Sequence, residues 1–360
     1  MGEFIGNDYL MAMRPQDIVL PTPNGVCCKL GGFHIDPTRP VDKAVITHGH
    51  SDHARAGHGA VLATAETIDL MRLRYGDGFA GSAQAVRYGE TVNLGDVKVT
   101  LHPAGHVLGS AQIALEADGL RIVASGDYKT IADPTCAPFE SVPCHVFITE
   151  ATFALPVFRH GDPDAEIAKL LHSVALFSER AHLIGAYSLG KAQRVIALLR
   201  KAGYGKPIFL HGSMEKITRY YQSRGFELGR LELARNASKA ELAGCIALCP
   251  PSALHEPWSR RFPDPLTCFA SGWMRVRARA RQHRIELPLV ISDHADWEGL
   301  TTTILGTGAA EIWVTHGQED ALVHWSLKQG LRARPLNIIG YDDEEEDTGD
   351  AARSNDSEHA

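Results

Sequence analysis

Three histidines and one aspartate lie within seven residues near the start of the chain. Residues 47–53 read Thr-His-Gly-His-Ser-Asp-His, with imidazoles at His48, His50 and His53 and a carboxylate at Asp52. Because alternate residues of an extended chain face the same way, His48 and His50 can bind one ion, while Asp52 and His53 are free to serve a second. Nitrogen and carboxylate ligands favour zinc, manganese or iron. A histidine-rich surface turn is the alternative interpretation.

Five short apolar runs along the chain lead into residues that can do acid–base or metal chemistry. The runs are 44–47, 121–125, 146–149, 287–291 and 312–315, and the residues that follow them are His48, Asp127, Glu150, His294 and His316. Runs of this length and composition predict buried strands. Residues that follow strand ends gather on one edge of an α/β sheet. We therefore expect these five side chains to share one site.

The middle of the chain predicts helices that alternate with strands. Asp162-Pro163 provides an N-cap and a first-turn proline ahead of apolar residues at helical spacing. Ser188 is expected to cap a second helix that runs to Gly203, and 204–210 is expected to form a strand. The alternation over roughly 180–285 predicts a smaller α/β domain inserted between the halves of a sheet-rich domain.

Composition places the chain among soluble globular proteins. Its 360 residues are 44% hydrophobic and 22% charged, and no apolar run reaches the roughly 18–20 residues that span a bilayer. The N-terminal residues lack the features of a secretion signal. Seven cysteines are an odd number in a chain too large to depend on disulfides. These features predict a cytoplasmic protein that does not associate with membranes.

The negative charge is concentrated at one end of the chain. The net charge is −7, and residues 341–360 contain nine acidic residues and one arginine. This segment has almost no apolar content, which predicts a disordered acidic tail. The remainder is close to neutral, so nucleic-acid binding would need a local basic patch.

Two segments offer such a patch. Arg275, Arg277, Arg279 and Arg281 alternate along the chain, and arginine binds phosphate with two parallel hydrogen bonds. An extended strand would place them on one face, where they can follow a nucleic-acid backbone, whereas a helix would spread them around its axis. Ser188 and Lys191 at the predicted helix start offer a second anion site. A solvated charged edge and a plain N-cap with a surface lysine are the respective alternatives.

The histidine-rich loop resembles the H-x-H-x-D-H signature of the metallo-β-lactamase superfamily. Other motifs of that superfamily have counterparts in order along the chain: Asp36 in 33–37, His106 in 104–109 and Asp127 in 125–128. Glu150, His294 and His316, in 149–152, 292–296 and 315–318, resemble motifs A, B and C of its nucleic-acid branch, called β-CASP. The stretches 186–191 and 270–274 also resemble conserved parts of that branch's inserted domain.

The resemblance implies an α/β fold, an αββα sandwich with an inserted β-CASP domain. Its parts would be 14–180 and 286–340 for the sandwich, 181–285 for the insertion and 341–360 for the tail. One divalent ion, Zn²⁺ or Mn²⁺, would be held by His48, His50, His106 and Asp127, and a second by Asp52, His53, His316 and Asp127. Two cations about 3.5–4 Å apart lower the pKa of a bridging water.

The remaining site residues have implied roles of their own. Asp36 would orient the ligand loop, and Asp52 would be part of the catalytic set as well as a ligand. His294, oriented by Glu150, would contact the phosphate or protonate the leaving oxygen. Alternatives remain: Asp36 as a turn cap, Glu150 in a surface ion pair and His294 as a core histidine.

The sequences of segments 271–277 and 292–297 most resemble those of the bacterial ligase-associated DNA exonucleases. The resemblance implies a two-metal DNA exonuclease directed to 5′ ends, with endonucleolytic cleavage of single strands as an option. It further implies work in DNA repair beside a DNA ligase and a helicase. An RNA-processing nuclease of the same branch is the alternative. A small-molecule hydrolase would lack the inserted domain and motifs A to C, and a non-catalytic scaffold would have lost ligands.

Overall fold

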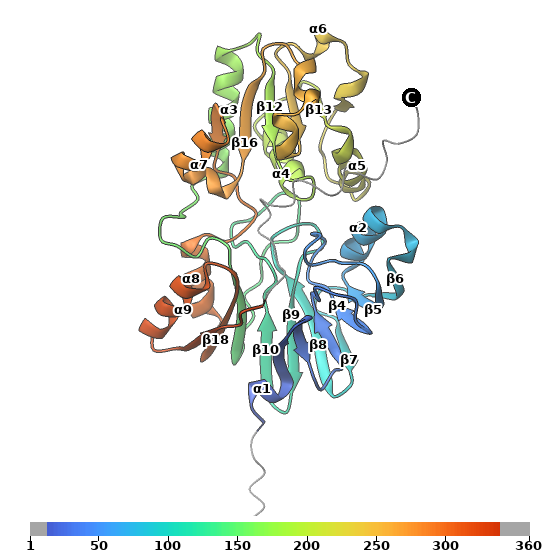
Figure 1. Cartoon of the computed structure of the whole chain (residues 1–360), viewed down its shortest axis with the longest axis vertical. Helices are drawn as coiled ribbons and strands as arrows, with labels where there is room; N and C mark the ends of the chain where they lie inside the picture. The colour runs from blue at the N-terminus through green and yellow to red at the C-terminus, as the bar shows by residue number, and fades with distance from the viewer. Residues whose placement is uncertain (1–12, 339–360) are drawn as a thin grey trace, which may run out of the picture.

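The computed structural model describes residues 13–338, arranged in two lobes (Figure 1). The predicted tail at 341–360 and the N-terminal residues considered for a secretion signal, apart from Met13, lie outside the described residues. The lower lobe contains two β-sheets and the upper lobe contains a third. The site described below lies where the lobes meet.

The first sheet contains six strands in sequence order, and the second contains seven. The strands of the first sheet are β1 Val19–Thr22, β2 Gly25–Cys28, β3 Phe33–Ile35, β4 Lys43–Val45, β5 His58–Ala63 and β6 Ala80–Ala85. The second sheet has the order β19 Arg332–Pro335, β18 Glu311–Gly317, β11 Val146–Ala151, β10 Leu120–Ala124, β9 Ala111–Ala117, β8 Val97–Pro103 and β7 Thr91–Leu94.

The two lower sheets pack face to face with helices on their outer faces. Phe33 and Val45 of the first sheet share one buried cluster with Val99 and Ile148 of the second. The helix α2 Ala65–Tyr75 covers the first sheet, and α8 Trp297–Gly306 with α9 Glu319–Lys328 covers the second. A short helix, α1 Pro15–Ile18, precedes β1. The layers therefore run α–β–β–α, and the predicted α/β class is confirmed.

The third sheet is built from parallel pairs throughout. Its order is β14 Leu231–Leu233, β13 Ile208–Leu210, β15 Ile246–Cys249, β12 His182–Gly185, β16 Leu266–Ala270 and β17 Leu287–Leu289. Its helices are α3 Pro163–Leu176, α4 Lys191–Lys201, α5 Glu215–Ser223, α6 Lys239–Leu242 and α7 Arg277–Gln282. Short 3₁₀ turns are η1 Asp77–Phe79, η2 Gly212–Met214, η3 Ala234–Asn236, η4 Pro251–Leu254, η5 Pro257–Arg261 and η6 Gly272–Arg275.

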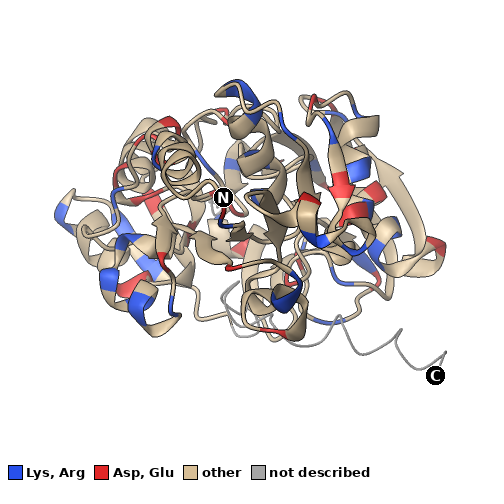
Figure 2. Ribbon diagram, turned by 90° about the horizontal axis from the view of Figure 1, so that it is seen from above, with Lys and Arg blue, Asp and Glu red and all other residues tan. Residues whose placement is uncertain are grey.

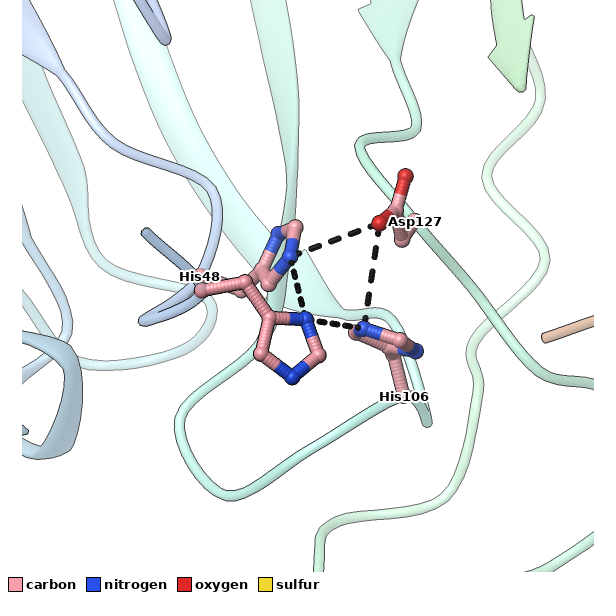
Figure 3. Close-up of side chains that lie close together, drawn as sticks. His48, His106 and Asp127 are labelled. Carbon is pink, nitrogen blue, oxygen red and sulfur yellow. Dashed lines mark hydrogen bonds and ion pairs between the residues drawn. The ribbon is translucent and has the colours of Figure 1, made fainter. Parts of the chain in front are cut away.

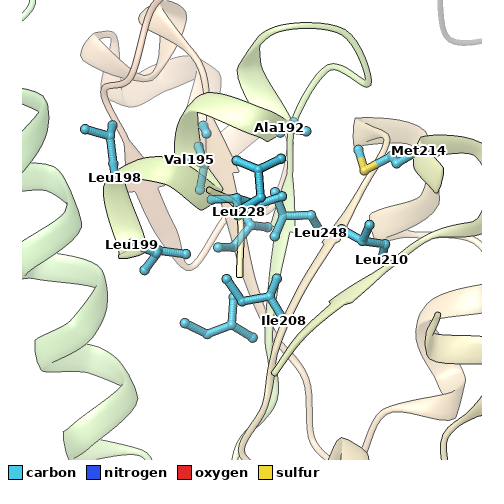
Figure 4. Close-up of a cluster of buried hydrophobic side chains, with 14 of the residues drawn as sticks. Ala192, Val195, Leu198, Leu199, Ile208, Leu210, Met214, Leu228 and Leu248 are labelled. Carbon is cyan, nitrogen blue, oxygen red and sulfur yellow. The ribbon is translucent and has the colours of Figure 1, made fainter. Parts of the chain in front are cut away.

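Both faces of the third sheet are covered, which explains its continuous apolar strands. On one face, Val195 and Leu199 of α4 belong to the same buried cluster as Ile208 and Leu248 (Figure 4). On the other face, Leu183 and Ala247 pack in a second cluster with α6 and η4. Because side chains alternate between faces, neighbours such as Ala247 and Leu248 enter different clusters.

The predicted starts of the two helices had different outcomes. Asp162 caps α3 as expected, because its side chain accepts a hydrogen bond from the Asp164 N–H. Ser188 does not cap α4, which begins at Lys191. Gly190 is the N-cap instead: it has φ +83°, and its N–H donates to Gln193 Oε1 at 2.8 Å. The predicted strand at 204–210 is shorter and covers Ile208–Leu210.

The upper lobe packs as a unit wider than the predicted 181–285. Ile167 and Leu170 of α3 and Leu289 of β17 belong to the same cluster as α4 and the third sheet. We therefore propose that the inserted unit runs from α3 to β17. In the chain, this unit lies between β11 and β18. These strands are parallel neighbours in the second sheet, where Val146 pairs with Glu311.

Among residues 13–338, no helix combines the length and apolar character required to cross a bilayer. Charges of both signs are interspersed over the ribbon seen from above (Figure 2). A nucleic-acid contact would therefore depend on local groups of basic side chains.

Candidate metal centre

Buried histidine and aspartate side chains converge at the end of the lower lobe that faces the third sheet. His48 follows β4, His106 follows β8 and Asp127 follows β10. Together with His50 they form the first donor group, whose ligand atoms all lie within 4.8 Å of one another. All four residues are buried. Three separate strand ends and one loop thus place nitrogen and carboxylate donors around a common point.

The donor atoms of the first group are close enough to be ligands of one ion (Figure 3). His50 Nδ1 lies 3.1 Å from His48 Nε2 and 3.0 Å from His106 Nε2. Asp127 Oδ2 lies 3.4 Å from His48 Nε2 and 3.8 Å from His106 Nε2. Donors about 2.0–2.1 Å from a tetrahedral zinc are separated by roughly 3.3–3.4 Å, so the observed spacing brackets that value.

The outer nitrogens of these histidines fix their tautomers. His106 Nδ1 lies 2.9 Å from the carbonyl oxygen of Asp293, and His50 Nε2 lies 3.2 Å from that of Leu189. A carbonyl only accepts, so each of these outer nitrogens carries the proton and the inner nitrogen of each ring has a lone pair. The two lone pairs therefore face each other at 3.0 Å. Metal-binding histidines commonly use their second nitrogen in this way.

A metal cation fits this arrangement better than a proton. Burial lowers the pKa of His106 to about 4, and burial together with the neighbouring His53 lowers that of His48 well below its usual value. Shared protons between the rings are therefore disfavoured near neutral pH. The buried nitrogen and carboxylate donors match the ligand chemistry of zinc and manganese.

Two of the residues predicted for a second ion, Asp52 and His53, lie near the same oxygen of Asp127, but with His316 they do not form a donor group as compact as the first among the described residues. His53 Nε2 lies 3.3 Å from Asp52 Oδ2 and 3.4 Å from Asp127 Oδ2. The rings of His53 and His316 stack with centroids 5.0 Å apart. Burial alone would lower the pKa of His53, but Asp52 and Asp127 outweigh it and raise the pKa well above its usual value. This position therefore favours a positive charge.

Asp36 holds the histidine-rich loop in place. Its Oδ1 accepts the Thr47 N–H at 2.7 Å, and its Oδ2 lies 2.8 Å from His53 Nδ1. Asp36 is buried and has φ +41°, a conformation that aspartate tolerates better than most residues. The arrangement is that of a carboxylate that orients a ligand loop.

Glu150 and His294 form a buried pair beside the first donor group. Glu150 Oε2 lies 2.9 Å from His294 Nδ1, and Glu150 Oε1 accepts the Tyr128 N–H at 2.7 Å. Burial raises the pKa of Glu150, against the opposing charge of His294. The His294 ring lies 4.6 Å from that of His106. An imidazole held in this way can donate or accept a proton next to a bound ion.

The predicted anion site at Ser188 and Lys191 is largely buried, because the Lys191 side chain is taken up by an ion pair inside the protein. Lys191 is 2% exposed, and its Nζ lies 2.8 Å from Asp293 Oδ1. The Ser188 carbonyl accepts a hydrogen bond from Gln193 Nε2 at 3.0 Å. Lys191 is therefore committed to a buried ion pair, which argues against the surface-lysine alternative and limits its reach toward a nucleic acid.

The alternating arginines lie on η6 and α7, so the helical alternative holds. Arg275, Arg277 and Arg281 are exposed, and they spread around the helix. The guanidinium of Arg279 lies 3.8 Å from the centroid of the Trp273 ring. The predicted flat stripe is therefore absent from this segment, while three exposed cations remain close in sequence to the site.

Sequence reasoning missed Asp293 and Leu189. Both supply main-chain carbonyls to histidines of the first donor group, and the Asp293 carboxylate is also buried. Every residue has a main-chain carbonyl, so the sequence does not show which carbonyls accept hydrogen bonds from the site. The Ser-Asp-His order at 292–294 was available as a signal for Asp293, because an acid next to a candidate acid–base histidine is a common partner.

No family model matches the chain. A protein named probable DNA ligase from Opitutus terrae is 28% identical over 334 residues, which are 86% of this chain and 32% of that protein. The endoribonuclease YSH1 of Saccharomyces cerevisiae is 32% identical over 119 residues, 32% of this chain and 15% of that protein. An RNase J-like protein of Methanocaldococcus jannaschii is 25% identical over 213 residues, 51% of each chain.

The chain thus spans between about a sixth and a half of the length of these relatives. Their names, together with the motifs above, point to the β-CASP branch of the metallo-β-lactamase superfamily. A crystal structure of a protein of unknown function from Enterococcus faecalis V583 has a TM-score of 0.53 at 13% identity and covers 81% of this chain and 78% of its own. It shares the fold.

Proposed function

We propose that the chain is a two-metal phosphodiesterase that degrades DNA as an exonuclease. One observation carries the proposal. Three buried imidazoles and the Asp127 carboxylate direct their donor atoms to one point, and the Glu150–His294 pair lies directly beside it. This combination provides both a cation site and a separate acid–base group, which phosphodiester hydrolysis requires.

The first donor group would hold one divalent ion, and Asp52, His53, His316 and Asp127 would hold another, with Zn²⁺ or Mn²⁺ as the ions. When bound, two such ions activate water for attack and neutralise charge on the phosphate. Asp127 Oδ2 lies 3.4 Å from both His48 Nε2 and His53 Nε2, a position suited to a shared ligand.

The remaining residues act around these ligands. Asp36 holds Thr47 and His53 and would thereby orient the ligand loop. Glu150 holds the Nδ1 side of His294, and the Nε2 side, 4.0 Å from Asp293 Oδ1, would transfer a proton to the leaving oxygen or donate a hydrogen bond to the phosphate. General acid catalysis of this kind contributes about 10²–10⁴-fold to the rate.

DNA is the proposed substrate because the relative that aligns over 86% of the chain is named a probable DNA ligase. The alternative is an RNA-processing nuclease, which is supported by the relatives named endoribonuclease and RNase J-like protein. Action from 5′ ends, cleavage of single strands and a role in repair beside a ligase and a helicase follow only from the resemblance. A cytoplasmic location is proposed from the composition and the cysteine usage. Arg275, Arg277, Arg279 and Arg281 are proposed to contact the backbone.

The test uses end-labelled DNA and RNA strands of one sequence, single- and double-stranded, with Zn²⁺, Mn²⁺ or Mg²⁺ added separately. The proposal expects faster DNA cleavage, with mononucleotides released first from the 5′ label. Asp127→Asn should abolish cleavage and reduce the bound metal measured by mass spectrometry. Asp118→Asn, in the exposed turn at the other end of β10, is the control and should behave like the wild type. Faster RNA cleavage would support the alternative, and metal-loaded protein inactive on both would refute both.

A further inference from the structure

The start of α4 contacts the partners of two metal-centre histidines, although it belongs to the upper lobe. Leu189, two residues before α4, supplies the carbonyl that lies 3.2 Å from His50 Nε2. Lys191, the first residue of α4, places its Nζ 2.8 Å from Asp293 Oδ1. Asp293 in turn supplies the carbonyl that lies 2.9 Å from His106 Nδ1. The upper lobe therefore contacts His50 directly, through the Leu189 carbonyl. It reaches His106 through Asp293.

A second contact from α4 fixes the same segment. Arg194 Nη1 donates to the Ser292 carbonyl at 2.5 Å, and Lys129 Nζ from the lower lobe donates to the same oxygen at 2.6 Å. Arg194 Nη1 also lies 3.2 Å from Asp133 Oδ2. Arg194 is 1% exposed and Lys129 3% exposed, and burial together with the neighbouring Arg194 lowers the pKa of Lys129 to about 7. Removal of a charged side chain from water carries a desolvation penalty, which only well-placed partners offset.

The segment held in this way carries the acid–base group. Ser292 precedes Asp293 and His294, and the Ser292 hydroxyl accepts the His294 N–H at 3.0 Å. A shift of the Ser292 carbonyl would move the Asp293 carbonyl away from His106 and the His294 ring away from Glu150. Arg194 and Lys129 thus hold the segment that contacts both His106 and Glu150.

We infer that Arg194 is a positioning residue for the metal centre: through the Ser292 carbonyl it sets the orientation of His106 and His294. The inserted upper lobe then has a role beyond substrate contact, because it completes the support of a metal site whose ligands all come from the lower lobe. This inference rests on the proposed metal role of the histidines. Loss of an outer partner of a ligating histidine typically costs 10–100-fold in metal affinity or activity.

The test compares Arg194→Met, Arg194→Lys and Arg200→Met in the full chain. Arg200 is the matched control, because it lies on the same helix and also donates to main-chain carbonyls. Its partners all belong to the upper lobe: Leu228, Tyr204, Lys206 and Arg230. Zinc affinity is measured by titration of Zn²⁺ alone into chelator-stripped protein. Cleavage gives kcat and KM, and urea unfolding gives stability.

We expect Arg194→Met to weaken zinc binding about 10-fold and to lower kcat at least as much, with KM little changed. Arg194→Lys keeps a charge and a donor, so it should recover part of both losses. Arg200→Met should lower stability and leave zinc affinity and kcat near wild type. If Arg194→Met matches Arg200→Met in zinc affinity and kcat, the role is structural only and the inference is overturned.

The two proposals fail in different ways. A wild-type chain that binds zinc but cleaves neither DNA nor RNA removes the proposed function, and the zinc titration of Arg194→Met then decides the inference by itself. A wild-type chain that binds neither zinc nor manganese overturns the inference.

Discussion

Glu150 Oε2 lies 2.9 Å from His294 Nδ1, although the two residues are 144 positions apart in the chain. Glu150 lies on β11, and His294 follows β17, the last strand of the third sheet. Since Glu150 Oε1 also accepts the Tyr128 N–H, the carboxylate is fixed at both oxygens and fixes the ring in turn. The pair therefore fixes the segment between β17 and α8 to β11, at the point where a proton would be transferred.

Replacement of either member of this pair should lower kcat without removing the metal. We expect His294→Ala to lower kcat by about 10²–10⁴-fold, and Glu150→Gln by a smaller factor, because Gln can still accept from Nδ1 but carries no charge. Steady-state cleavage and metal analysis are the measurements. An unchanged kcat in His294→Ala would show that the ring has no part in proton transfer.

Asp36→Asn should weaken metal binding by about 10–100-fold. The amide can keep one of the hydrogen bonds of the carboxylate but cannot accept at both positions from Thr47 and His53. Competition with a chelator of known affinity measures the effect. Asp42→Asn, at an exposed position before β4, is the control. Equal metal affinity in the two variants would contradict the orienting role.

Gly190→Ala should disturb the contact between the lobes. A Cβ at Gly190 would lie 2.3 Å from Val107 Cγ1, next to His106. Gly203→Ala is a matched control, because the two glycines have φ +83° and +85° and a Cβ at Gly203 meets nothing within 4 Å. Overpacking costs about 1–3 kcal/mol, so we expect Gly190→Ala to be less stable than Gly203→Ala by that amount in urea unfolding. Only Gly190→Ala should also lose metal affinity.

Removal of the exposed arginines at η6 and α7 should weaken DNA binding in a salt-dependent manner. For Arg275, Arg277 and Arg281 changed together to Ala, each lost phosphate contact should reduce the slope of log K against log salt by about 0.9 on duplex DNA. Fluorescence anisotropy at several salt concentrations measures the slope. Arg14, Arg87 and Arg332 changed together to Ala remove the same charge from exposed positions elsewhere. Equal slopes for the two triple variants would exclude these arginines from the interface.

His160 should contribute to acid unfolding. It is 8% exposed, and burial lowers its pKa to about 3. The pKa of a histidine in the unfolded chain is near 6.5. Between pH 3 and pH 6.5 the unfolded chain therefore binds a proton at His160 that the folded chain does not, so the free energy of unfolding falls as the pH falls.

The pH dependence of stability from His160 is that of one additional proton bound by the unfolded chain. Relative to His160→Gln, the wild type should lose up to about 1.4 kcal/mol for each pH unit below 6.5. Urea unfolding at pH 7 and pH 5 measures the difference. His172→Gln, at an exposed position of α3, is the control for the substitution itself. A pH-independent difference for His160→Gln would contradict the prediction.

The fold class was predictable because the strands have short apolar runs and because their ends carry the polar residues. The α3 start was predictable from Asp162 and Pro163, whose chemistry is local. The α4 start was not, because Gly190 adopts a positive φ to approach Val107, and that approach depends on the rest of the fold. Local signals predict local structure, and tertiary contacts decide between competing caps.

The candidate site was predictable only as far as side chains identify it. His48, His50 and His53 lie close in sequence, so their spacing alone indicates a common ion site. Leu189 and Ser292 take part through carbonyl oxygens, which any residue possesses, so nothing in the sequence singles them out. Arg194 and Lys129 were not singled out from the sequence, because only the packing of the two lobes places them at one oxygen.

The insertion between β11 and β18 also constrains how the protein folds. These two strands are hydrogen-bonded neighbours, yet the whole upper lobe lies between them in the chain. Pairing over such a distance is slow, whereas the upper lobe can form its sequential parallel units first. His316 lies on β18, so the last donors would be assembled late. A nascent chain would therefore complete the donor set of the second ion only after β18 has docked, whereas the first donor group is encoded entirely before the insertion.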